Sequence, residues 1–160
     1  HRPEGAQKLA AQWRAEGVNA QAVPDLQAAV RRADIVSCAT LSTAPLVQGD
    51  WLGPGPHLDL PGSSTPQMRE ADPSCFGGGA RTFVDTEEAL KKSGDLLDAM
   101  AGGQLRADAV QATLAQLCKG ERTGRTSAEE RTVFKAVGSA LEDLAAATLV
   151  WQAQGERDST

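Results

Sequence analysis

The chain contains no apolar run long enough to span a bilayer, so we expect no transmembrane helix. Its first four residues, His-Arg-Pro-Glu, lack the pattern of a signal peptide, and we therefore expect a cytoplasmic protein. Lysine and arginine are not clustered, and the formal net charge is -5. Because nucleic-acid backbones and anionic membranes attract clustered positive charge, we expect neither as the main partner.

Cysteine and histidine are also scarce. The three cysteines, Cys38, Cys75 and Cys118, are an odd number at wide spacings, which fits neither a disulfide framework nor paired zinc ligands. The histidines, His1 and His57, are too few and too far apart in the sequence to indicate a metal site. We therefore expect no bound metal.

The 160 residues can bury one core of ordinary domain size, so one domain is expected. Helical and strand patterns alternate along the first two thirds, which is typical of an α/β fold with a parallel sheet. Helices are predicted at residues 3–17, from Asp25 onward, and at 86–94, with a single helical turn at 50–52. Strands are predicted at 18–23, 35–39, 57–61 and 81–85.

The segment from His57 to Glu70 is the strongest candidate for a ligand site. Pro61 and Gly62 end its predicted strand, and three hydroxyl-bearing residues, 63–65, follow at once before a proline. In an open α/β sheet, ligands bind beyond the carboxyl ends of the strands, where this loop would lie. The alternative interpretation is a surface turn whose hydroxyls bond only to their own backbone.

The last third of the chain is predicted to be helical. Asp108 can cap a helix that ends at Gly120, and Ser127 begins a capping box for a longer helix reaching Trp151. Apolar residues from Val133 onward recur in that helix at steps of three and four, which predicts a packing face. The segment from residue 153 to 160 is expected to be a frayed tail.

A parallel sheet needs a strand from which the opening helix crosses, and no strand pattern precedes that helix here. The chain also lacks Gly-x-Gly-x-x-Gly between a strand and a helix, the turn that holds a pyrophosphate, and Gly77 to Gly79 lack the flanking pattern. Two interpretations follow. Either this is a nucleotide-free α/β domain, or the front of a dinucleotide-binding fold lies outside these 160 residues.

A resemblance decides between the two. Short motifs spread in order over nearly the whole chain resemble the ornithine cyclodeaminase and mu-crystallin family, and although each motif is weak, their succession is specific. The matching segments are residues 33–36, 49–52, 54–57, 62–70, 83–85, 93–95, 124–126 and 134–146. The resemblance implies a partial Rossmann-type parallel sheet at 1–152 with flanking helices and a long C-terminal helix. It also implies that the front strands and a substrate and dimer domain are absent from these residues.

Members of this family are dimers that move a hydride between NAD or NADP and the α-carbon of an amino or imino acid. The resemblance implies that Arg2 faces the 2′-phosphate of NADP, although a solvated terminal arginine is the alternative. It also implies cofactor contacts in three loops. The residues are Ala39, Thr40 and Leu41 in the first, Gly62 and Ser63 in the second, and Ala136, Val137 and Gly138 in the third.

Ser64 is the predicted catalytic residue. It aligns with the position where cyclodeaminases carry an aspartate and mu-crystallin-like reductases carry a serine. A hydroxyl can hold a water or donate to an imino acid but cannot supply a carboxylate's charge, which favours a ketimine reductase or amino-acid dehydrogenase. A cyclodeaminase, a non-catalytic ligand-binding protein like mu-crystallin and a degraded fragment that only dimerises are the alternatives. The 160 residues alone are expected to be inactive.

Lys92 departs from the family pattern, because relatives often carry a glutamate before the Ser-Gly-Asp motif at 93–95. The lysine indicates either an altered choice of substrate or a shifted, solvated helix end.

Overall fold

The computed structural model describes residues 3–157, with side chains described through residue 154. The chain divides into two compact units, one that ends at Ala33 and one that begins at Asp34. Within the described residues, no helix is both long and apolar enough to cross a membrane. Arg2, predicted to contact the cofactor, lies outside the described residues.

The first unit contains two helices, α1 (Pro3–Ala15) and α2 (Leu26–Val30). Asp25 caps α2, because its carboxylate accepts a hydrogen bond from the main-chain N–H of Ala28 at 2.9 Å. The strand predicted at 18–23 is wrong, since this segment has no regular structure. A lone strand has no stability without a hydrogen-bonded neighbour, and no strand of the described sheet pairs with it.

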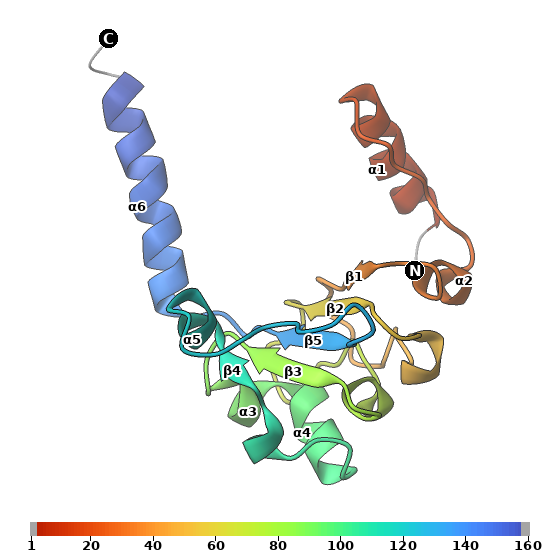
Figure 1. The fold of residues 1–160 in the computed structure, drawn as a ribbon. Helices are drawn as coiled ribbons and strands as arrows, with labels where there is room; N and C mark the ends of the chain where they lie inside the picture. The colour runs from red at the N-terminus through yellow and green to blue at the C-terminus, as the bar shows by residue number, and fades with distance from the viewer. Residues whose placement is uncertain (1–2, 158–160) are drawn as a thin grey trace. The chain divides into compact units, whose positions relative to one another are not determined.

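The second unit is built on a five-stranded parallel sheet (Figure 1). The order across the sheet is β1-β2-β5-β3-β4, and every neighbouring pair is parallel. The strands are β1 (Ile35–Ser37), β2 (His57–Leu60), β3 (Arg81–Val84), β4 (Ala112–Thr113) and β5 (Thr132–Lys135). The predicted α/β class and the predicted place of residues 57–60 in a parallel sheet are therefore confirmed.

The long final helix predicted from Ser127 is wrong over its first half. Its apolar residues at 132–135 form β5, which occupies the middle of the sheet between β2 and β3 (Figure 1). Ladder hydrogen bonds on both edges and complete burial of Val133 favour the strand. Gly138 then adopts a positive φ of 79°, which interrupts the regular backbone before α6 (Ala140–Arg157). The same helix continues through residues 153–157, where a frayed tail was predicted, and residues 158–160 lie outside the described part.

Two other predicted helices are divided. The segment 86–94 contains only α3 (Ala89–Lys92), and Gly94 begins α4 (Gly94–Ala101) instead of ending a helix. Ser93 is the reason, because its extended backbone stops α3 while its hydroxyl caps α4 by accepting from Leu96 N at 3.4 Å. The segment 108–120 is divided because residues 112 and 113 pair with β3 as strand β4, which leaves only α5 (Leu114–Cys118).

Three 3₁₀ turns, at Gly49–Trp51, Pro73–Phe76 and Ala107–Ala109, complete the second unit. The first of them lies where a single helical turn was predicted. The core of this unit consists of apolar side chains from the strands and from the helices and turns packed on them. Its most deeply buried members are Val47, Leu58, Leu60, Cys75, Ala89, Leu96, Ala99 and Val133.

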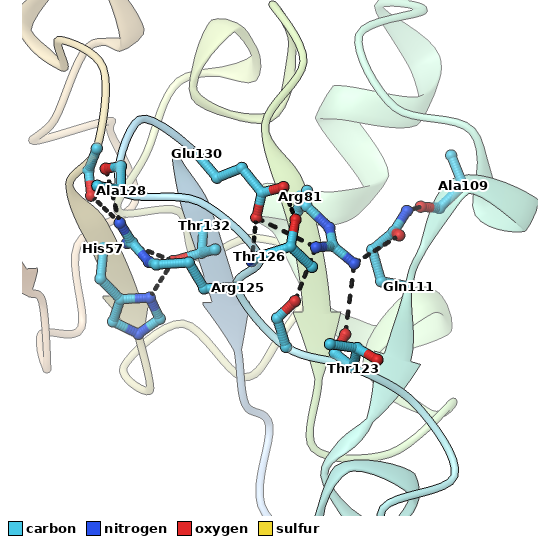
Figure 2. A network of polar contacts seen from close by, with 12 residues as sticks. His57, Arg81, Ala109, Gln111, Thr123, Arg125, Thr126, Ala128, Glu130 and Thr132 are labelled. Atoms are coloured by element: carbon cyan, nitrogen blue, oxygen red, sulfur yellow. Dashed lines mark hydrogen bonds and ion pairs between the residues drawn. The ribbon is translucent and has the colours of Figure 1, made fainter.

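Polar side-chain contacts connect the starting ends of the three central strands, β2, β5 and β3 (Figure 2). His57 Nδ1 and Thr132 Oγ1, at the starts of β2 and β5, are 2.8 Å apart, and Arg125 also donates to that hydroxyl at 3.1 Å. Arg81, at the start of β3, forms an ion pair with Glu130 at 3.1 Å. Burial lowers the pKa of His57, so the neutral ring is favoured here. These contacts fix the edge of the sheet opposite to the one where the loops after β1, β2 and β5 leave it.

Candidate functional site

Three of the predicted cofactor segments lie together at the carboxyl edge of the sheet. The loops 39–41, 62–64 and 136–138 follow β1, β2 and β5, which are neighbouring strands. Because the strands are parallel, all three loops leave the sheet at the same edge. The structure therefore brings together every predicted site residue except Arg2, which it does not describe. The arrangement places these residues but does not test their roles.

Glu70 ties the first two loops together. Its carboxylate accepts hydrogen bonds from the main-chain N–H of Thr40 at 2.5 Å and of Gly62 at 3.0 Å. Glu70 is fully buried, so these charge-assisted bonds form away from water, where they are strong. The loop after β1 is thereby fixed against the loop after β2.

Gly62 allows the close approach of these loops. A Cβ built on this glycine would meet the carboxylate of Glu70 and the main-chain nitrogen and oxygen of Thr40. Main-chain atoms of a packed loop cannot move aside as the end of a flexible side chain can. The packing of one loop on the other is therefore enough to require a glycine at position 62, whether or not a cofactor binds there.

Ser63 and Ser64 face opposite ways. Ser63 is completely buried, and its hydroxyl accepts a hydrogen bond from Lys135 Nζ at 2.8 Å and donates one to Asp95. Ser64 is exposed. The residue predicted to be catalytic is therefore accessible to a ligand, while its predicted cofactor-binding neighbour is engaged inside the protein.

Asp95, in the first turn of α4, holds the far side of the same loop. Its Oδ1 accepts from the main-chain N–H groups of Glu70 at 2.7 Å and Ala71 at 3.0 Å. Gly94 packs directly beneath, because its N–H donates to Thr65 O at 3.1 Å and a Cβ there would lie 2.8 Å from Pro66 O. The loop from 62 to 71 is thus anchored along its length by the start of α4.

Asp85 performs the equivalent task for the loop after β5. Its Oδ2 accepts from the N–H groups of Val137 at 2.8 Å and Gly138 at 2.7 Å. Asp85 is 4% exposed and lies just beyond the last residue of β3. The loop predicted to approach the nicotinamide is therefore held in place by a buried carboxylate.

The exposed positions of the three loops define the surface open to a ligand. Leu41 is 77% exposed, and Ala39, Ser64 and Gly138 are also exposed, while Thr40, Ala136 and Val137 are half-buried. Small side chains predominate, which permits a ligand to approach the backbone closely. Near this edge, burial and the carboxylate of Glu70 raise the pKa of the Cys38 thiol to about 11, so this cysteine is not a nucleophile.

Lys92, the last residue of α3, has an exposed side chain. Its ammonium is 3.6 Å from a carboxylate oxygen of Glu88, and its side chain is 59% exposed. The structure thus shows the solvated helix end, one of the two interpretations of this lysine.

Four buried charged residues, Glu70, Asp85, Asp95 and Lys135, were not predicted as part of the site. Each was recognised only within a motif, without a role. Lys135 carried the clearest signal, because a lysine among Val133, Phe134, Ala136 and Val137 breaks an otherwise apolar run. Among the described residues, no group of three or more histidine, cysteine, aspartate or glutamate side chains could hold a metal ion.

The five-stranded parallel sheet with flanking helices places the chain in the class of Rossmann-like α/β proteins. The chain belongs to the ornithine cyclodeaminase/mu-crystallin family, whose family model matches residues 1–157.

Similar proteins include two curated relatives and one solved structure. A Delta(1)-pyrroline-2-carboxylate reductase of Paracoccus denitrificans is 39% identical over 150 residues, which are 93% of this chain and 47% of the relative. The ketimine reductase mu-crystallin of Mus musculus is 38% identical over 127 residues, 79% of this chain and 37% of the relative. The Delta(1)-pyrroline-2-carboxylate reductase of Thermococcus litoralis, solved in complex with NADH and L-proline, superposes with a TM-score of 0.92 at 30% identity. That superposition covers 98% of this chain and 49% of the solved one.

The chain therefore spans half or less of the length of the proteins it matches.

Proposed function

We propose that the complete protein is an NAD(P)H-dependent oxidoreductase that acts on the C–N bond of imino or amino acids, as a ketimine reductase or amino-acid dehydrogenase. The observation that carries the proposal is the exposed Ser64 at the carboxyl edge, beside the loops after β1 and β5. The reductases among the similar proteins, one of them solved with NADH and L-proline, support the same chemistry.

The residues present fit one side of a dinucleotide. We assign Ala39, Thr40 and Leu41 to the ribose and the segment 136–138 to the nicotinamide, because these loops flank the loop after β2 at the same edge of the sheet and contain mostly small residues. Arg2 is assigned to the 2′-phosphate if the cofactor is NADP. The chain contains no Gly-x-Gly-x-x-Gly turn between a strand and a helix, so we assign no residue to the pyrophosphate.

When bound, a reduced nicotinamide supplies the hydride that converts an imine carbon to an amine carbon. The protein's own residues position the reactants. Ser64 can donate a hydrogen bond to the imino acid or hold a water next to it, since its hydroxyl is exposed. It cannot act as the general base that a carboxylate would be, and this favours reduction over cyclodeamination.

The finer features implied by the family remain proposals. A homodimer is supported by the apolar side chains that α6 leaves exposed, among them Leu141 at 78% and Trp151 at 77%. The extent of the partial Rossmann domain, 1–152, and the cytoplasmic location stay predictions.

The proposal is tested with the complete natural protein. Consumption of NADPH and of NADH is followed with pyrroline-2-carboxylate and with its six-membered cyclic analogue as substrates. Ser64→Ala is expected to lower kcat by about 10- to 100-fold, at or below the range for a positioned proton donor. Ser127→Ala, which also removes an exposed serine hydroxyl, is the matched control and should leave kcat unchanged.

Two results would contradict reduction. Formation of proline and ammonia from ornithine would indicate a cyclodeaminase despite Ser64. Saturable ligand binding without turnover of any cyclic ketimine would indicate a binding protein.

A further inference from the structure

Lys135, the last residue of β5, is a lysine with no exposed surface. Lysines are almost never fully buried unless they are paired, so this position requires an explanation. Neither the resemblance nor the comparisons assign it a task. The inference below rests on the proposed function, because it concerns the geometry of the same site.

The ammonium group of Lys135 is fully satisfied by the protein. Nζ lies 2.7 Å from Leu60 O, 2.8 Å from Ser63 Oγ and 3.3 Å from Asp95 Oδ2. An ammonium has three donors, and these three acceptors use all of them. Lys135 therefore has no donor left for a substrate or cofactor, and any effect it has on the reaction acts through its partners.

The positions of Leu60 and Ser63 in the fold show which segments Lys135 connects. Leu60 ends β2, and Ser63 lies in the loop that follows it. Lys135 itself immediately precedes the loop 136–138. One side chain thus connects the end of β5 to the loop after β2, across the edge where both loops face a ligand.

The connection also sets the direction of Ser64. Since Ser63 and Ser64 are adjacent, drawing one hydroxyl into the protein turns the other outward. Ser63 is drawn inward by bonds to both Lys135 and Asp95. The other bonds that hold this loop are made by main-chain groups of its neighbours, such as Gly62 and Thr65, and none of them involves the hydroxyl of Ser63.

The charges make this cluster sensitive to a single change. Asp95 and Lys135 are both fully buried, so removing either one leaves the other as a buried charge without its ion-pair partner. Burial lowers the pKa of Lys135, and the adjacent Asp95 carboxylate opposes that change.

We propose that Lys135, together with Asp95, is a positioning residue that fixes the Ser64 hydroxyl relative to the loop 136–138. A purely structural ion pair would contribute to folding alone. The two roles differ in what happens when the pair is replaced by a neutral one.

The decisive variant is therefore Asp95→Asn with Lys135→Met in the complete natural protein. Asparagine keeps an oxygen for the N–H groups of Glu70 and Ala71, and methionine fills the space of the lysine stem, so neither member of the ion pair is left charged without the other. The carboxylates of Glu70 and Asp85, which also act on Lys135, keep their main-chain N–H donors. The single variant Lys135→Met is also made, but it can fail to fold. Lys91→Met, whose lysine is 72% exposed, is the matched control and should behave as the parent protein.

Two measurements are made on the folded double variant. We expect kcat for the cyclic ketimine to fall at least tenfold while KM for NADPH changes less than threefold and the melting temperature stays close to that of the parent. We also expect amide hydrogen exchange at Ser63, Ser64 and Thr65 to speed up at least tenfold. The exchange measurement needs no activity.

The proposal would be overturned if the double variant had the same kcat and the same rates of amide hydrogen exchange as the parent protein. It would also be overturned if the loss of activity were fully explained by the fraction of the double variant that is unfolded. If the parent protein reduces no imine, the proposed function fails, yet faster exchange in the loop would still support the positioning role and unchanged exchange would refute it.

Discussion

Asp85 and Val137 are joined by a hydrogen bond of 2.8 Å from the main-chain N–H of Val137 to Oδ2 of the carboxylate. The same oxygen accepts from Gly138 at 2.7 Å, and Oδ1 accepts from Thr86 N at 2.6 Å. One buried carboxylate at the end of β3 therefore holds three main-chain donors, two of them in the loop after β5. Glu70 and Asp95 act similarly on the loops after β1 and β2.

Replacement of Asp85 by alanine should destabilise the protein. The N–H groups of Val137 and Gly138 would lose a charged acceptor that is itself buried, at a cost of about 1 to 3 kcal/mol. Urea unfolding followed by circular dichroism measures the loss. Asp108→Ala removes a carboxylate that is 68% exposed and should change the free energy of unfolding by less than about 0.5 kcal/mol. Equal losses in the two variants would refute the role given to Asp85.

Residues 57–60 were predictable because their apolar side chains alternate and a proline and glycine follow them. The start of α2 was predictable because an aspartate, Asp25, directly precedes its apolar residues and aspartate commonly caps helices. Local signals also misled, since residues 132–135 fit a helical spacing as well as a short buried strand, and only pairing with β2 and β3 decides between them.

The buried charges of the site could not be predicted because their partners are distant in sequence. Glu70 bonds to Thr40, 30 residues away, and Lys135 bonds to Ser63, 72 residues away. A lone charged residue in a sequence normally indicates an exposed position. Only the fold brings these residues to the loops that carry the predicted ligand contacts.

Substitution of Gly62 by alanine should destabilise the loop it occupies. The added methyl group would lie 2.5 Å from Thr40 O and still closer to other fixed atoms, so the loops after β1 and β2 must separate. Overpacking of this kind costs about 1 to 3 kcal/mol. The free energy of unfolding in urea is the measurement. Gly53→Ala meets no atom within 4 Å and should be nearly neutral, and a neutral Gly62→Ala would show that the loops are not in contact.

The three cysteines should react at very different rates with iodoacetamide in the folded protein at neutral pH. Cys118 is exposed, whereas Cys38 and Cys75 are buried. Burial raises the pKa of Cys75 to about 12 and, together with nearby carboxylates, that of Cys38 to about 11, so neither thiolate is populated. Peptide mass spectrometry should find label on Cys118 first and on all three only in denaturant. Early labelling of Cys75 would contradict its burial.

Glu130 should make the stability of the folded protein depend on pH in the acid range. Hydrogen bonds from Thr126, with a contribution from Arg81, lower the pKa of this carboxyl from 4.5 to about 2. Because the folded state holds the charged form more strongly than the unfolded state does, the stabilisation is complete above pH 4.5 and is lost as the pH falls toward 2. Glu130→Gln should therefore lower the melting temperature at pH 7, and the difference from the parent should shrink at pH 3. Glu121→Gln removes an exposed carboxylate and serves as the control. A difference between Glu130→Gln and the parent that is the same at both pH values would show that the charge of Glu130 does not stabilise the start of β5.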